Sequence, residues 1–229
     1  MTNAVNKNYN DETILRISPE KNTLTVETKR ADGSIAYKEI SPVELYDTIN
    51  QSYLSTECLS SGFLPENCLY VSMSSRERTF FLWNPELRAD VAYGAQEYPD
   101  FPIPRLVFGI RMLATGRIAD CSIGVVADER PMPETPMFLY PFSNVYSNGN
   151  VCSGNNVLPK YRNQTALRNF PRYLLGLPDN DDMYRPEHNQ LGLAHKDLME
   201  HLKDKDPAYY YSHILIPNGK ILDDFINRR

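Results

Sequence analysis

The chain lacks the features that mark several large classes of protein. Its 229 residues contain no apolar run of 18, the length that a helix needs to span a bilayer. Acidic side chains outnumber basic ones by 29 to 24, so no excess of basic charge favours nucleic acid or anionic membranes. GxxxxGK(S/T), GxGxxG, HExxH and GxSxG motifs do not occur either. We therefore expect no bound cofactor, no nucleic acid partner and no membrane partner.

Cysteine is sparse as well. The four cysteines, at positions 58, 68, 121 and 152, have no CxxC spacing and are too few for a disulfide scaffold. The first dozen residues are polar and rich in asparagine, without the charged and then apolar pattern of a secretion signal. We therefore expect a cytoplasmic protein with reduced thiols, in which Cys58 and Cys68 do not pair.

A histidine metal site is not expected. His188, His195 and His201 all lie in the C-terminal part of the chain. His195 and His201 are six residues apart, so they would not share one face of a helix. These side chains are interpreted as exposed polar histidines, and no metal is predicted.

The residues that are present predict a packed globular fold of the α+β class. Hydrophobic residues make up 41% and charged residues 23% of the chain, which is typical of a globular domain. A capping box, Ser41 to Glu44, predicts a helix over 42–53. Strands are predicted within 14–40, with a hairpin turn at Asp32 and Gly33, and then at 69–73, 79–83, 106–112 and 118–126. Helical patterns return at 164–175, 195–203 and 222–228.

Two segments stand apart from these elements. Residues 98–104 are too rich in proline for a helix or a central strand and are interpreted as an ordered, packed loop. Residues 140–159 contain five asparagines and two glycines, which is typical of a functional loop beside a sheet. The predicted organisation is a tail at 1–12, strands and a helix at 13–54, a core at 55–175, and a helical extension of the same domain at 176–229.

Cys152 differs from the other cysteines in its surroundings. Cys121 lies inside an alternating strand and is predicted to be buried, and Cys68 is predicted to be partly buried. Cys152 is flanked by asparagine, serine and glycine, a setting that can present a thiol to a partner. A thiolate attacks a carbonyl carbon well, and the reaction then needs a donor for the oxyanion. Asn144, across the Asn148–Gly149 turn, is the candidate donor.

The ordered set of motifs around this segment resembles the ubiquitin-conjugating enzyme superfamily. In that superfamily a proline-rich stretch leads into a strand, and a His-Pro-Asn triplet follows further on. The acceptor cysteine, in a Gly-x-Ile-Cys motif, lies eight residues after the Asn of the triplet. The corresponding segments here are 98–108, Phe142-Ser-Asn144 and Gly149-Asn-Val-Cys152. The chain is more similar still to the bacterial branch called PRTRC system protein B, through residues 130–136, 141–152 and 158–159.

The resemblance implies a ubiquitin-conjugating-enzyme-like fold, an antiparallel meander with flanking helices and a long active-site loop. It implies that Cys152 accepts a ubiquitin-like protein as a thioester and passes it to an amine, with Asn144 holding the oxyanion. The implied partners are a ubiquitin-like protein, an activating enzyme and a metallopeptidase-like protein of the same operon. Two departures matter: Phe142 and Ser143 replace the His and Pro of the triplet, and residues 160–229 match the branch poorly.

An acidic residue that helps the incoming lysine is also implied by the resemblance. Asp179, Asp181 and Asp182 follow the cysteine, and the sequence does not choose among them. No lysine occurs between Lys38 and Lys160, a pattern that keeps amines away from a thioester.

The sequence leaves three alternatives open. The chain can be a catalytically silent module of the same fold that only binds a ubiquitin-like protein, which the altered triplet favours. It can be a cysteine peptidase that pairs Cys152 with a later histidine. It can also be a structural protein of a mobile-element operon.

Overall fold

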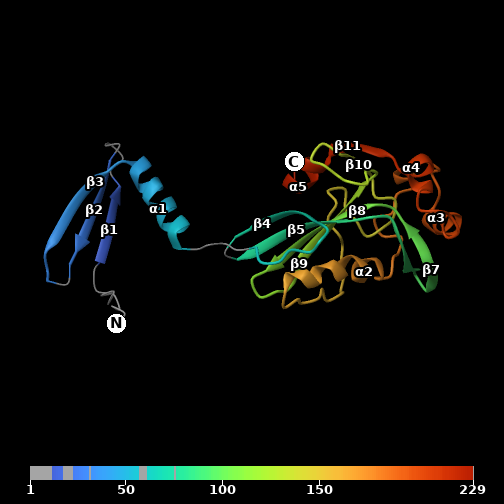
Figure 1. The fold of residues 1–229 in the computed structure, drawn as a ribbon, viewed down its shortest axis with the longest axis horizontal. Coiled ribbons are helices and arrows are strands. Elements are labelled where there is room, and N and C mark those ends of the chain that lie inside the picture. Colours follow the sequence, from blue (N-terminus) through green and yellow to red (C-terminus); the bar gives the residue numbers. More distant parts are fainter. Residues whose placement is uncertain (1–11, 18–22, 31, 57–60, 75, 229) are drawn as a thin grey trace. The chain divides into compact units, whose positions relative to one another are not determined.

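The computed structural model describes residues 12–17, 23–30, 32–56, 61–74 and 76–228, which fall into two compact units, 1–60 and 61–229 (Figure 1). The predicted N-terminal tail, except for its last residue, and Cys58 lie outside the described residues. Within them, no helix is both long enough and apolar enough to cross a membrane.

The N-terminal unit contains a three-stranded antiparallel sheet in the order β1-β2-β3, and a helix, α1, follows the sheet in the chain. The elements are β1 (Glu12–Ile17), β2 (Leu24–Lys29), β3 (Ile35–Ile40) and α1 (Pro42–Thr56). The predicted turn joins β2 to β3. Gly33 has φ +83°, and Ser34 donates its backbone N–H and its hydroxyl to Asp32 Oδ1. The predicted capping box is also confirmed, because the Ser41 N–H donates to Glu44 Oε2 at 2.7 Å and the Glu44 N–H to Ser41 Oγ at 3.1 Å.

The C-terminal unit is built on a six-stranded sheet in the order β11-β10-β9-β8-β5-β4, with antiparallel pairing throughout; the strands are β4 (Cys68–Met73), β5 (Glu77–Asn84), β8 (Leu106–Leu113), β9 (Ile118–Val126), β10 (Pro136–Phe138) and β11 (Pro217–Ile221). The four strands predicted here are confirmed. The turn at Thr115 and Gly116 joins β8 to β9, with Gly116 at φ +82° and its N–H donating to Leu113 O. β10 and β11 were not predicted.

The proline-rich segment 98–104 was predicted to be a loop, and that prediction is wrong. Its residues form most of β7 (Gln96–Ile103), which pairs with β6 (Leu87–Tyr93) in a separate two-stranded sheet. A two-stranded sheet leaves each strand one free edge, where a proline that lacks an N–H removes no ladder hydrogen bond. Tyr98, Phe101 and Ile103 are buried, so packing of these side chains holds the strand in place.

The helices of this unit are short: η1 (Gln164–Asn169), α2 (Phe170–Leu175), η2 (Pro186–His188), α3 (His195–Leu202), α4 (Tyr209–His213) and α5 (Leu222–Asn227). The three predicted helical segments are confirmed, although the first divides into a 3-10 helix and an α-helix. The division lies just before Pro171, which occupies the first turn of α2 because it cannot donate within a longer helix.

Both faces of the six-stranded sheet carry buried side chains. One face contributes Phe80, Leu82, Phe108 and Ile110 to a core that also contains Leu167 and Phe170 of the helical segment 164–175, which runs along the sheet in Figure 1. The opposite face has a smaller cluster: Phe81, Val107, Val126, Met137 and Leu222. Cys121 is 1% exposed, as predicted, and Cys68 is half-buried. Helices on an antiparallel sheet make this an α+β fold.

Candidate active site

The segment that carries Cys152 is attached to the central strand β9. The Ile123 N–H donates to Gly149 O at 2.8 Å, and the Val151 N–H donates to Cys121 O at 2.9 Å. Ile123 and Cys121 belong to the buried core, so these bonds fix the segment to the packed interior of the unit. Residues in a loop with such a support are held precisely.

Within the segment the chain folds into a narrow hairpin that places Cys152 opposite Asn144. The Cys152 N–H donates to Asn144 O at 2.8 Å, and Val145 pairs with Val151. The turn depends on Gly149, which has φ +84°. A Cβ atom there would lie 2.9 Å from the ring of Phe225, so glycine is required sterically as well. The eight-residue spacing of the sequence motif is the length of this hairpin.

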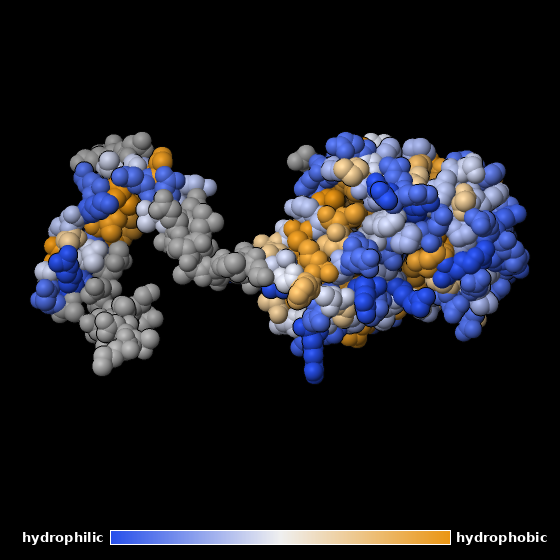
Figure 2. All heavy atoms as spheres, in the orientation of Figure 1, coloured by the Kyte–Doolittle hydropathy of each residue, from blue (hydrophilic) through white to orange (hydrophobic). Residues whose placement is uncertain are grey.

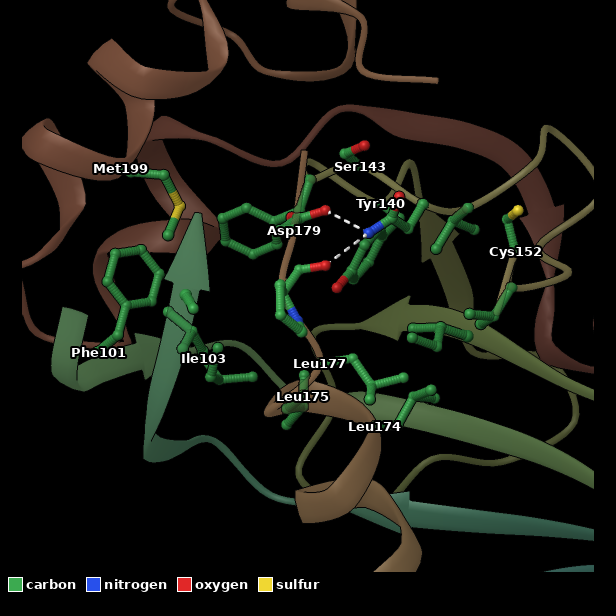
Figure 3. Close-up of a pocket in the computed structure, with 18 of the residues that line it drawn as sticks. Phe101, Ile103, Tyr140, Ser143, Cys152, Leu174, Leu175, Leu177, Asp179 and Met199 are labelled. Atoms are coloured by element: carbon green, nitrogen blue, oxygen red, sulfur yellow. Dashed lines mark hydrogen bonds between the residues drawn. The ribbon is translucent and has the colours of Figure 1, made fainter. Parts of the chain in front are cut away.

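Asn144 is held through both its backbone and its side chain. Its φ is +59°, a conformation that asparagine tolerates better than most residues. Its Nδ2 donates to Asp179 Oδ1 at 2.8 Å and, at the longer distance of 3.4 Å, to Pro178 O (Figure 3). The neighbouring Ser143 hydroxyl donates to Asp182 O. The loop at 178–182 therefore holds Ser143 and Asn144, the second and third residues of the triplet.

Asn144, Cys152 and Asp179 line one pocket with a volume of about 70 Å³. Apolar side chains form its floor and far wall: Phe101, Ile103, Leu174, Leu175, Leu177 and Met199. In Figure 3, Cys152 lies at the end of the pocket opposite Phe101 and Met199. The half-buried thiol thus lies at the rim of an apolar hollow.

The three candidate acidic residues are separated by the structure. Asp179 reaches Asn144, as described above. Asp181 points elsewhere, because its two carboxylate oxygens accept from the Tyr93 hydroxyl at 2.8 and 2.9 Å, and its side chain is 71% exposed. Asp182 is exposed and holds Ser143 and Asn144 through its backbone oxygen.

His195 corrects the prediction of exposed histidines. His188 and His201 are half-buried, and the side chain of His195 is 1% exposed. The His195 ring stacks on Tyr184 at 4.3 Å and meets Tyr93 edge-on at 4.6 Å. Its Nε2 lies 3.3 Å from Asp179 Oδ2, and its Nδ1 lies 3.0 Å from Asn180 O. Across the described part of the chain, no three His, Cys, Asp or Glu side chains group as metal ligands.

Burial makes two of the described cysteines less reactive. Burial raises the pKa of Cys121 to about 12 and also raises the pKa of Cys68, so both thiols resist ionisation near neutral pH. Tyr146 adjoins Cys152, and a hydrogen bond to Cys152 raises the pKa of the Tyr146 phenol. Tyr146 and His195 are site residues that sequence reasoning missed. Tyr146 lies inside the motif two residues after Asn144, whereas no local pattern marks His195.

Comparison with known proteins relates the chain to one described family. A family model described as prokaryotic E2 family D matches residues 45–173, more than half of the chain. The matched range contains Asn144 and Cys152 and ends before Asp179 and His195. No curated protein and no solved structure matches the chain.

Proposed function

Because this chain belongs to prokaryotic E2 family D, we propose that it is a ubiquitin-conjugating-like enzyme that carries a ubiquitin-like protein as a thioester on Cys152 and passes it to an amine. The observation that supports this most strongly is the hairpin that sets the half-buried Cys152 opposite Asn144, with N–H to O at 2.8 Å. The more specific assignment to the PRTRC system protein B type, with an activating enzyme, a ubiquitin-like protein and a metallopeptidase-like protein as partners, is part of this proposal. So is a cytoplasmic location, where the thiol stays reduced.

The reaction has two acyl-transfer steps. In the first, the Cys152 thiolate attacks the thioester carbon on the activating enzyme. A new C–S bond forms, the old one breaks, and the activating enzyme's cysteine leaves as a thiolate. In the second step an amine attacks the same carbon. The C–N bond forms, the C–S bond to Cys152 breaks, and the amine loses a proton as the Cys152 thiolate leaves.

Asn144 has the chemistry of an oxyanion donor in both steps, since its side-chain amide carries two N–H groups. The bond from Nδ2 to Pro178 O, at 3.4 Å, is long and weak. For the proposed role, this N–H must exchange Pro178 O for the acyl oxygen, while the other N–H of the same amide keeps its shorter bond to Asp179. Asp181 and Asp182 are exposed and remain the candidates to orient an incoming amine; the Asp182 carboxylate is one of them, whereas both carboxylate oxygens of Asp181 accept from Tyr93.

A non-reducing gel tests the proposal. The protein is mixed with ATP and with the activating enzyme and ubiquitin-like protein encoded beside it. We expect a band shifted by one ubiquitin-like unit that thiol removes. Cys152→Ala should abolish the band, and Cys152→Ser should convert it into a thiol-resistant ester. Cys68→Ser is the matched control and should leave the band unchanged. No adduct on the wild-type chain, with the activating enzyme itself charged, would contradict the proposal.

A catalytically silent binding module is the second candidate. The favouring observation is that the hydrogen bonds of Asn144 Nδ2 are made to Asp179 and Pro178 O. In that case the unit binds the ubiquitin-like protein and the gel shows no adduct. A peptidase has less support: among the described residues no histidine is hydrogen-bonded to Cys152, and His195 contacts Asp179 and Asn180 instead.

A further inference from the structure

A chain of contacts runs from Asn144 into the buried interior. Asn144 Nδ2 donates to Asp179 Oδ1 at 2.8 Å, and Asp179 Oδ2 lies 3.3 Å from His195 Nε2. The Asp179 carboxylate is thus held between the amide and an imidazole whose side chain is 1% exposed. Its loop is also fixed to β6, because the Asp179 N–H donates to Ala92 O at 2.7 Å.

The partners of His195 determine where its hydrogens lie. Nδ1 is 3.0 Å from Asn180 O and 3.4 Å from Asp181 Oδ1, and both of these oxygens accept hydrogen bonds. Nδ1 therefore carries a hydrogen. In a neutral ring Nε2 would then present a lone pair to Asp179 Oδ2. A neutral ring would thus leave the buried Nε2 without a partner, since it forms no hydrogen bond among the described residues, whereas a proton on Nε2 would give Asp179 Oδ2 an ion-pair partner at 3.3 Å.

Among the residues that the structure describes, the titratable groups that contact the His195 ring are two phenols and two carboxylates. A hydrogen bond to Asp181 raises the pKa of Tyr93, and burial raises the pKa of Tyr184 to about 12, so both phenols are neutral at physiological pH. On α3 itself the adjacent Lys196 and Asp197 are exposed. Asp179 and Asp181 are the carboxylates that contact the ring.

We propose that Asp179 and His195 are a proton-sharing pair of positioning residues that fixes the Asn144 amide, in place of the His missing from the triplet. The inference rests on the proposed function. Asp179 retains one N–H of Asn144 and so leaves the other for the acyl oxygen on Cys152. His195 holds the second carboxylate oxygen and prevents Asp179 from turning. Both residues lie in the C-terminal part of the chain, beyond the range 45–173 that the family model matches.

The experiment uses the full chain and a small probe. Cys152 is charged with a glycine-ended peptide thioester of 2-mercaptoethanesulfonate, excess probe is removed, and discharge to free lysine is followed by intact mass. The decisive variants are Asp179→Ala, His195→Asn and His195→Gln. The Gln amide can replace Nε2–H and donate to Asp179, whereas the shorter Asn amide can replace only Nδ1–H. Glu187→Gln, an exposed carboxylate on η2, is the control.

Each variant is charged to completion before discharge is measured, because Asn144 is proposed to act in both acyl-transfer steps. Discharge should slow by about 10- to 100-fold in Asp179→Ala and His195→Asn, stay within about 3-fold in His195→Gln, and not change in Glu187→Gln. Wild-type discharge in Asp179→Ala and His195→Asn, or equal loss in His195→Gln and His195→Asn, would overturn the inference.

The pair is also tested without a thioester. ¹⁵N-histidine NMR should show His195 with a hydrogen on Nδ1 and a proton at Nε2 that is lost in Asp179→Asn, with His195→Asn used to assign the signal. A neutral ring protonated at Nε2 alone would overturn the inference. Failure of wild-type Cys152 to charge would instead count against the proposed function, and the NMR result would still show whether the pair exists.

Discussion

In the N-terminal unit, Leu24 and Ile40 are the buried hydrophobic residues among those the structure describes, whereas the C-terminal unit buries a cluster of 25 residues that includes Phe108 and Phe170. A tight turn joins β2 to β3, and a capping box begins α1; both are local devices. The C-terminal strands are held by side chains far apart in sequence. The difference indicates that the buried core, and not local propensity, provides the rigid support for Asn144 and Cys152.

The two units are more alike in their exposed apolar side chains than in their cores. Tyr37 of β3 is 66% exposed and Tyr46 of α1 is 65% exposed. In the C-terminal unit, exposed apolar side chains gather beside β4, where Leu69 and Tyr70 lie at the surface (Figure 2). Both units therefore show apolar side chains to solvent, but only the C-terminal unit combines them with an extensive described core.

The largest expected effect comes from the core of the C-terminal unit. Phe108 is 0% exposed, and Phe108→Ala should lower the free energy of unfolding by about 3–5 kcal/mol, since the cavity adds to the lost transfer energy. Chemical denaturation monitored by the fluorescence of Trp83 in β5 measures this change. Tyr37→Ala is the control and should change the same free energy by less than about 0.5 kcal/mol. Equal losses in the two variants would remove the contrast between the units.

A smaller effect is expected at the hairpin turn of the candidate site. Gly149→Ala should destabilise the C-terminal unit by about 1–3 kcal/mol and slow charging of Cys152, because the new Cβ is crowded against Phe225 at a positive φ. The matched control is Gly154→Ala. Gly154 also has a positive φ, +51°, but a Cβ there meets nothing within 4 Å. If Gly154→Ala slowed charging as much as Gly149→Ala, the hairpin would not be held in the way described.

The capping box of α1 should give the smallest effect. Ser41→Ala should weaken the helix by about 1 kcal/mol, seen as faster hydrogen exchange over the first turns of α1 and not in β8 or β9. The hydrogen bond from the Ser41 N–H lowers the pKa of Glu44. A lowered folded-state pKa contributes stability above the ordinary carboxyl pKa, and this stability is lost as pH falls through the folded value. The protection factors of the α1 amides, which correct for the pH dependence of the intrinsic exchange rate, should therefore fall on acidification, and those in β8 should show no matching fall.

The parts of this fold that local chemistry determines could be predicted. Helix α1 was marked by its capping box and the strands β4, β5, β8 and β9 by their apolar alternation. The approach of Asn144 to Cys152 followed from motif spacing and an Asn-Gly turn. The β7 strand was missed because its prolines are tolerated only at the free edge of a two-stranded sheet, which a local pattern does not reveal.

The supporting residues could not be predicted for a related reason. Asp179 reaches Asn144 because its loop pairs with β6, where Gly94 N–H donates to Asp179 O at 2.9 Å. The strand β6 was itself unpredicted, so no choice among the three aspartates was possible. His195 opens a helix with exposed neighbours on either side, Ala194 and Lys196, and only the packing of Tyr93 and Tyr184 buries it.

The proposed function requires that the Cys152 thiol itself carries the acyl group. The most direct test is intact-mass and peptide-mapping analysis of the chain after charging by the activating enzyme and the ubiquitin-like protein, in wild type, Cys152→Ala and Cys121→Ala. If Cys152 is the carrier, we expect one acyl group per chain on Cys152, present in wild type and Cys121→Ala and absent in Cys152→Ala. An acyl group that persists in Cys152→Ala, or a wild-type chain that is never acylated, would contradict the proposed function.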